Sequence, residues 1–255
     1  MISSHIKPAR WRRTRWGATR KRLLAVFSYR YDAQLVPDLL ANIDPVVDGW
    51  IAFDDRAASG VFSSEPARRR ALLGAACDAG ANWILAIDPD ERLERGVADA
   101  VGRLMATSRR RKAWGFHCRE MYTPDAYRVD GVWGDKVQHR LFSAYDAAEY
   151  QSADLHGQWF PPSGGFALRH CGLNLYHLKM IEPRRRAGRR DIYNHLDPRR
   201  DFQPIGYDYL TDEAGVRLET IARGREYHPP HVDDGGMWMA DLAGEGSACF
   251  SPDRS

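Results

Sequence analysis

The chain has 255 residues, of which 44% are hydrophobic and 28% are charged, and its formal net charge is +3. This length supports one sizeable hydrophobic core, and the composition is typical of a soluble globular protein. No apolar run is long enough for a membrane span or a secretory signal, and the four cysteines are too scattered for a zinc ribbon or a disulfide framework. We therefore expect a cytoplasmic protein.

The charge is distributed unevenly along the chain. Residues 1–22 contain eight lysines and arginines, two tryptophans and no acid, so the remainder of the chain is slightly acidic. Such a basic arm can bind nucleic acid or another polyanion, or it can be a solvated segment. Residues 224–255 are rich in glycine and proline and show no periodicity, which predicts a tail. This leaves residues 23–223 as a single domain.

The first half of this domain alternates predicted strands and helices. Strands are expected at Leu23–Tyr29, Val46–Phe53 and Trp83–Ile87, and helices at Asp32–Ile43 and Ser64–Ala79, with Asp32 and Ser64 as N-caps. This βαβαβ order predicts parallel strands joined by right-handed crossovers.

The second half predicts more strand than helix. A helix is expected over Arg92–Met105, and an aromatic, strand-rich region over 113–144. A last strand is expected at Leu173–Ile181, and a basic helix at Glu182–His195. The fold class is therefore α/β, with a mixed sheet flanked by helices.

Acidic side chains follow two of the predicted parallel strands. Asp88 and Asp90 flank Pro89 directly after the third strand, and Asp54 and Asp55 end the second. Ligands of open α/β sheets bind outside the carboxyl ends of the strands, and two carboxylates at i and i+2 can hold one hard divalent cation. The alternative is a polar turn that caps the next helix.

Four segments in this order, F-S-Y-R, F-D-D-R, A-R-R-R and I-D-P-D-E-R, resemble motifs of the family 2 glycosyltransferases, which have the GT-A fold. The resemblance covers about the first 100 residues. It implies that Asp54 or Asp55 contacts the nucleoside of a nucleotide-sugar donor, with a UDP-sugar favoured. It also implies that Asp88 and Asp90 bind Mn²⁺ or Mg²⁺ together with the donor diphosphate. Pro89 and the loop Ser28–Tyr31 depart from the family pattern.

Further residues match the same family. Arg68, Arg69 and Arg70 lie near the start of a helix whose N-terminus is expected to face this sheet edge, where at least one arginine can reach a diphosphate; a solvated helix face is the alternative. His177 resembles the histidine that completes the metal coordination, or it is a core residue. Trp133, which precedes Arg-Leu-Phe, is either a sugar platform or core. Arg189 belongs to a helix that can close over the diphosphate as a lid, or it is solvated.

Inversion at the anomeric carbon, which the resemblance implies, requires a general base on the acceptor side. The family places an acid just after a histidine there, but in this chain Gly157 follows His156. Asp154 or His156 are the candidates in that segment, and Asp130 and Asp135 are others.

The sequence thus predicts a metal-dependent transferase that moves a sugar from a nucleotide donor to an unidentified acceptor. Two other functions remain open. One is a nucleic-acid-binding protein on a degenerate transferase scaffold, and a polyanionic acceptor would combine it with the first. The other is a metal-dependent phosphohydrolase of the haloacid dehalogenase type, in which Arg92 would occupy a position where those enzymes have threonine or valine.

Overall fold

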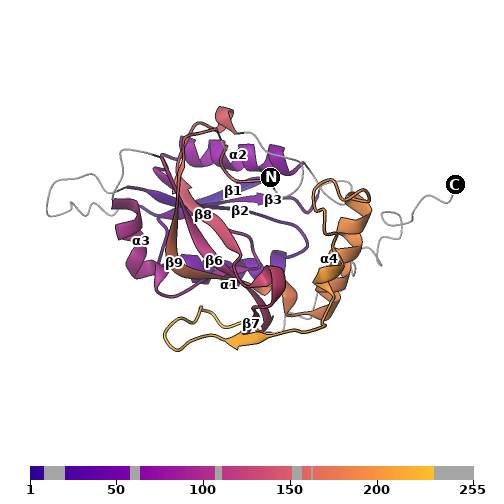
Figure 1. Cartoon of the computed structure of the whole chain (residues 1–255). Coiled ribbons are helices and arrows are strands. Elements are labelled where there is room, and N and C mark those ends of the chain that lie inside the picture. The colour runs from indigo at the N-terminus through magenta and orange to yellow at the C-terminus, as the bar shows by residue number, and fades with distance from the viewer. Residues whose placement is uncertain (9–20, 58–63, 107–110, 151–156, 162, 233–255) are drawn as a thin grey trace.

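The protein is built on one mixed sheet, in which three neighbouring strands are parallel (Figure 1). The computed structural model describes residues 1–8, 21–57, 64–106, 111–150, 157–161 and 163–232. Strand β2 (Leu23–Tyr29) lies between β3 (Gly49–Asp54) and β4 (Trp83–Ala86), and both neighbours pair with it in parallel. The four residues of β4 are all buried, as expected for a strand covered on both faces.

Antiparallel strands extend the sheet on both sides. The order is β1-β3-β2-β4-β8-β6-β7-β10, and β9 pairs in parallel with β6 and antiparallel with the short β5. The additional strands are β1 (Ile2–Ile6), β5 (Glu91–Leu93), β6 (Lys112–Thr123), β7 (Ala126–Arg128), β8 (Val137–Ser143), β9 (Ala167–His177) and β10 (Leu218–Thr220).

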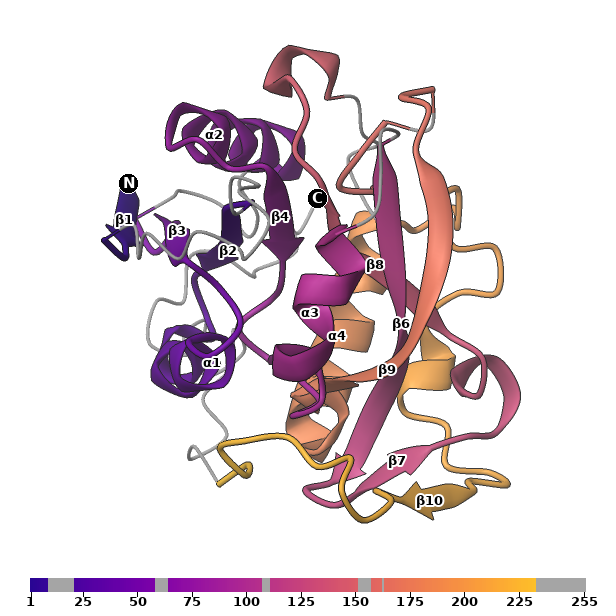
Figure 2. The ribbon, with the colours of Figure 1, turned by 90° about the vertical axis from the view of Figure 1, so that its left-hand side faces the viewer.

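Helices cover both faces of the parallel strands (Figure 2). Helix α2 (Glu65–Asp78) packs on one face, and α1 (Val36–Ile43) and α3 (Val97–Ala106) pack on the other. Helix α4 (Pro183–Leu196) follows β9 and borders the carboxyl ends of the strands. In the described part of the chain, each helix is too short or too polar to cross a bilayer.

Local sequence signals account for the bounds of α2. The Ser64 hydroxyl accepts a hydrogen bond from the Ala67 amide at 3.3 Å, so Ser64 is the predicted N-cap. Pro66 occupies the first turn, where its missing N–H costs nothing. The chain leaves the helix through Gly80, whose φ of +76° favours glycine.

Several predicted bounds were wrong. The helix expected from Arg92 begins only at Val97, because Glu91–Leu93 forms β5 against β9. Asp32 precedes a short 3₁₀ turn, but its side chain makes no cap and instead accepts a hydrogen bond from the Arg30 amide. The last strand starts earlier than expected, at Ala167, and ends at His177.

Part of the predicted arm and part of the predicted tail contact strands or residues of the central domain. Residues Ile2–Ile6 of the arm form an edge strand against β3, while residues 9–20 lie outside the described part of the chain. In the predicted tail, Tyr227 is buried and Arg225 forms an ion pair with Glu94 at 2.8 Å. Residues 233–255 are outside the described residues.

Candidate functional site

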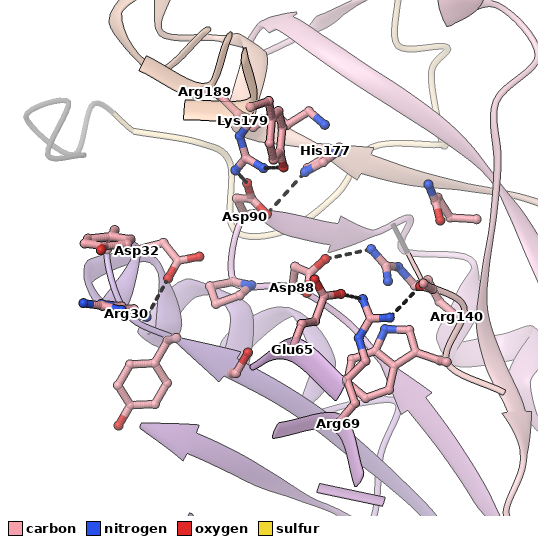
Figure 3. Close-up of a pocket in the computed structure, with 18 of the residues that line it drawn as sticks. Arg30, Asp32, Glu65, Arg69, Asp88, Asp90, Arg140, His177, Lys179 and Arg189 are labelled. Carbon is pink, nitrogen blue, oxygen red and sulfur yellow. Dashed lines mark hydrogen bonds and ion pairs between the residues drawn. The ribbon is translucent and has the colours of Figure 1, made fainter. Parts of the chain in front are cut away.

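A pocket of about 570 Å³ opens at the carboxyl ends of β2, β3 and β4. Its other walls come from β8, from the start of α2 and from α4, so that distant parts of the chain meet around the acidic turn (Figure 3). The charged side chains that line it are Arg30, Asp32, Asp55, Glu65, Arg68, Arg69, Asp88, Asp90, Lys136, Arg140, Lys179 and Arg189, together with His139 and His177.

Asp90 and His177 face each other in this pocket. The His177 Nε2 atom lies 3.3 Å from an Asp90 carboxylate oxygen, and the Nδ1 atom lies 3.1 Å from Glu120. Burial alone would lower the pKa of His177, but the Glu120 and Asp90 carboxylates raise it well above its usual value. Burial would raise the pKa of Asp90, but His177 and Arg189 lower it well below its usual range. The pair is therefore ionised at neutral pH.

Glu120 lies behind His177 as a fully buried carboxylate. It forms ion pairs with Lys136 and, at 3.5 Å, with Lys179, in addition to His177. Burial would raise the pKa of Glu120, but these cations lower it well below its usual value. A buried charge must be paired in this way because its desolvation is costly.

Asp88 turns to the other side of the acidic turn. Its carboxylate accepts a hydrogen bond from the Arg140 guanidinium at 2.8 Å, and the same guanidinium contacts the buried Glu91. The Asp88 amide in turn donates to Glu91 at 3.0 Å. In Figure 3, Asp88 and Asp90 therefore point toward different cations. The Asp88 side chain keeps 41% of its surface exposed to the pocket.

A buried arginine supports the backbone of the turn. Arg92 is only 1% exposed, and its guanidinium donates to the carbonyls of Pro89 and Glu91 at 2.7 Å each. A third bond, of 3.3 Å, reaches the Leu35 carbonyl before α1. Arg92 thus ties the acidic turn to the neighbouring loop after β2.

Asp54 and Asp55, either of which was expected to contact the donor nucleoside, lie in different surroundings. Asp55 and Arg68, which were predicted separately, both line the pocket and form an ion pair at 2.8 Å. Asp54 is outside the pocket lining and pairs with Arg56 at 2.7 Å. Arg70 is also outside the lining, with its guanidinium 3.4 Å from the Tyr150 carbonyl.

Other predicted residues lie as follows. Arg189 lines the pocket and approaches Asp90 at 3.5 Å. Trp133 is 4% exposed and packs beside Tyr209 in a core cluster, outside the pocket lining. Asp154 and His156, the general-base candidates, lie outside the described residues.

Arg69 of the A-R-R-R motif lines the pocket, as does Asp32, which was predicted only as a helix cap. Arg69 stacks on Trp159, with 4.6 Å from guanidinium to ring centroid, and pairs with Glu65. Asp32 lies near the acidic turn, and burial, followed by the charges of Asp90 and Asp88, raises its pKa to about 7. The sequence around Glu120 and Lys136 predicts strands and no site. The ion pair between these two residues depends on the pairing of β6 with β8 and β9.

The donor chemistry around Asp90 fits a hard divalent cation. Two ligands of one Mg²⁺ or Mn²⁺ ion at right angles lie about 3 Å apart, close to the Asp90–His177 separation. A cation would take the place of the proton between these two groups, so His177 would bind it as the neutral imidazole and the proton would be released. Metal-bound histidines commonly donate their second ring N–H to a carboxylate, which is the role that Glu120 offers to His177. Asp88 lies on the same turn and can add a third ligand by leaving Arg140.

A second group of donors, Cys118, Glu120 and His177, lies within 4.8 Å in the described part of the chain. This cluster does not fit a cation, because two lysine ammonium groups already contact Glu120. An added ion there would face like charges in a buried environment.

No protein-family model matches the chain, and no curated protein shows significant sequence similarity to it. The fold itself is a mixed α/β domain with a large open sheet flanked by helices.

Proposed function

We propose that this protein is a metal-dependent glycosyltransferase of GT-A type, which transfers a sugar from a nucleotide donor to an unidentified acceptor with inversion. The observation that carries the proposal is the contact between Asp90 and His177 in the pocket. Asp90 and Asp88 lie on the same turn, at the carboxyl ends of three parallel strands. The two carboxylates offer the oxygen ligands that suit Mn²⁺ or Mg²⁺, and a nitrogen ligand from neutral His177 would favour Mn²⁺ over Mg²⁺.

Electrostatics of the pocket support the same chemistry. A nucleoside diphosphate gains negative charge as the glycosidic bond breaks, and a bound divalent ion would neutralise part of that charge. Arg189 and Lys179 reach into the pocket beside Asp90, where they can stabilise the diphosphate as it departs. Arg140 holds Asp88 until the ligands are in place.

The shape of the pocket also suits a nucleotide sugar. Its volume of about 570 Å³ falls in the range of small-molecule sites. Tyr29 at the end of β2 and Tyr31 in the loop after it line the pocket, as does the ion pair between Asp55, which follows β3, and Arg68 of α2. These groups offer stacking surfaces and polar contacts for a nucleoside, with a UDP-sugar as the favoured donor.

The test is donor turnover. Purified protein is incubated with UDP-, GDP-, dTDP- and CMP-sugars, with and without Mn²⁺, and released nucleotide is measured. We expect slow, metal-dependent release from one donor class, lost in Asp90→Asn and retained in Asp44→Asn, whose side chain is 70% exposed on the surface. No release from any donor, or equal release without metal, would contradict the proposal.

A further inference from the structure

A pair of histidines lies on the antiparallel half of the sheet, and one of them, His139, also lines the pocket. His139 of β8 and His170 of β9 both pair with Gly115 of β6, one on each side of it. Their ring centroids are 6.1 Å apart, with an angle of 71° between the ring planes. Three neighbouring strands thus place two imidazoles over one glycine.

Gly115 leaves the space that the two rings use. A Cβ atom at this position would lie 2.5 Å from a Val137 methyl carbon and 3.1 Å from the His139 Nε2 atom. Any side chain there would therefore clash with Val137 and crowd the His139 ring. The absence of a side chain on Gly115 thus lets the Nε2 atom lie close to the β6 backbone.

The His139 Nε2 atom is a buried nitrogen with no hydrogen-bond partner within the described residues. Buried polar atoms are rarely left in this state. The ring is held at 84°, edge to face, against Phe160, at 6.2 Å between centroids. Burial, followed by His170, lowers the pKa of His139, so the ring is neutral at neutral pH, which is the form that binds metals.

We propose that His139 and His170 bind a borderline divalent ion, with Zn²⁺ as the best fit, over Gly115. Imidazole nitrogens suit Zn²⁺ at about 2.0–2.1 Å, and water completes the coordination. His170 is exposed, so its ring can rotate until one of its nitrogens and the His139 Nε2 atom reach the same ion. The ion would link β8, β6 and β9, and its ligands differ from those of the oxygen-rich site proposed at Asp90, although His139 also lines that pocket.

The experiment is thermal unfolding of chelator-treated protein with Zn²⁺ or with Mg²⁺, without nucleotide. We expect an excess of Zn²⁺ to raise the Tm by about 3 °C, and Mg²⁺ to have no comparable effect. The shift should disappear in His170→Ala, return in His170→Cys, which restores a zinc ligand, and persist in the control His195→Ala on α4. It should also persist in Asp90→Asn, so the two sites are distinguished.

Three results would overturn the proposal. They are no Zn²⁺ shift in the wild type, an equal shift in His170→Ala, and a shift that is lost in Asp90→Asn. The last result would assign the ion to the acidic turn instead. Because His170 is exposed, His170→Ala should fold normally, and circular dichroism checks this directly.

Discussion

The His177 imidazole bridges two carboxylates, with Nε2 at 3.3 Å from Asp90 and Nδ1 at 3.1 Å from Glu120. The first carboxylate faces the pocket and the second is fully buried. This chain of three groups connects the acidic turn after β4 to the interior of the antiparallel half of the sheet. The two contacts fix the orientation of the His177 ring.

Glu120 should therefore control metal binding without touching the metal. Replacing Glu120 with Gln leaves the shape but removes the charge that orients His177, and we expect Mn²⁺ affinity to fall about 10- to 100-fold. Electron paramagnetic resonance of free Mn²⁺ measures this. Glu149→Gln, at an exposed ion pair with Arg111, is the control and should bind as the wild type does. Unchanged affinity in Glu120→Gln would show that His177 is not a ligand.

Arg92 should stabilise the acidic turn. Arg92→Met keeps the length of the side chain but leaves the Pro89 and Glu91 carbonyls without a donor, and we expect a loss of about 2–4 kcal/mol in the free energy of unfolding. Urea unfolding measures this loss. Arg199→Met, whose side chain is 84% exposed, should change stability by less than about 0.5 kcal/mol. Equal stability of the two variants would mean that the turn holds its shape without Arg92.

Asp32 should make stability depend on pH. Because its pKa is raised to about 7 in the folded protein, the folded state binds this proton more tightly than the unfolded chain does. Its contribution to stability is thus present at low pH and is lost as the pH rises through about 7. Asp32→Asn should be more stable than the wild type by about 1–2 kcal/mol near pH 8, after allowance for its partial exposure, and the gap should vanish near pH 4. A gap that is constant with pH would contradict this.

The strands and helices around the site were largely predictable, because they depend on local patterns. The apolar runs of β2 and β4 and the Ser64 cap of α2 identify themselves within a few residues. Strand β5 was missed because Glu91 and Arg92 are charged, and only their pairing with β9 and their internal partners explain why they are buried. Edge strand β1 likewise depends on β3, more than 40 residues away.

The candidate site shows the same contrast between local patterns and long-range pairing. Asp88 and Asp90 were predicted from the acidic turn, and His177 from a histidine in a late strand, and all three line the pocket. The Glu120–Lys136–Lys179 network behind His177 was not predicted, since three strands must pair before its charges meet. Trp133 is a core residue and not a sugar platform in the pocket, because residues distant in sequence cover it, such as Met180 before α4 and Tyr207 and Leu210 after α4.

Asn42 should stabilise the link between α1, β5 and the segment near residue 228. Its amide accepts from the Leu93 amide at 2.7 Å and donates to the carbonyls of Leu93 and His228 at 3.0 and 2.7 Å. Asn42→Ala leaves these buried groups unpaired, and we expect a loss of about 2–4 kcal/mol in denaturant unfolding. Asp44→Ala, at the exposed end of the same helix, should have little effect. Similar losses in the two variants would argue against this role.

The most direct test of a metal-dependent donor site at the acidic turn is thermal unfolding with a panel of nucleotide sugars, with and without Mn²⁺. It is made on the wild type, on Asp90→Asn, on Asp88→Asn and on the surface control Asp44→Asn. We expect one nucleotide class to raise the Tm only when Mn²⁺ is present, and we expect both acidic-turn variants to lose this shift while the control keeps it. A nucleotide shift that is independent of Mn²⁺, or that survives in Asp90→Asn, would contradict a metal-dependent donor site at this turn.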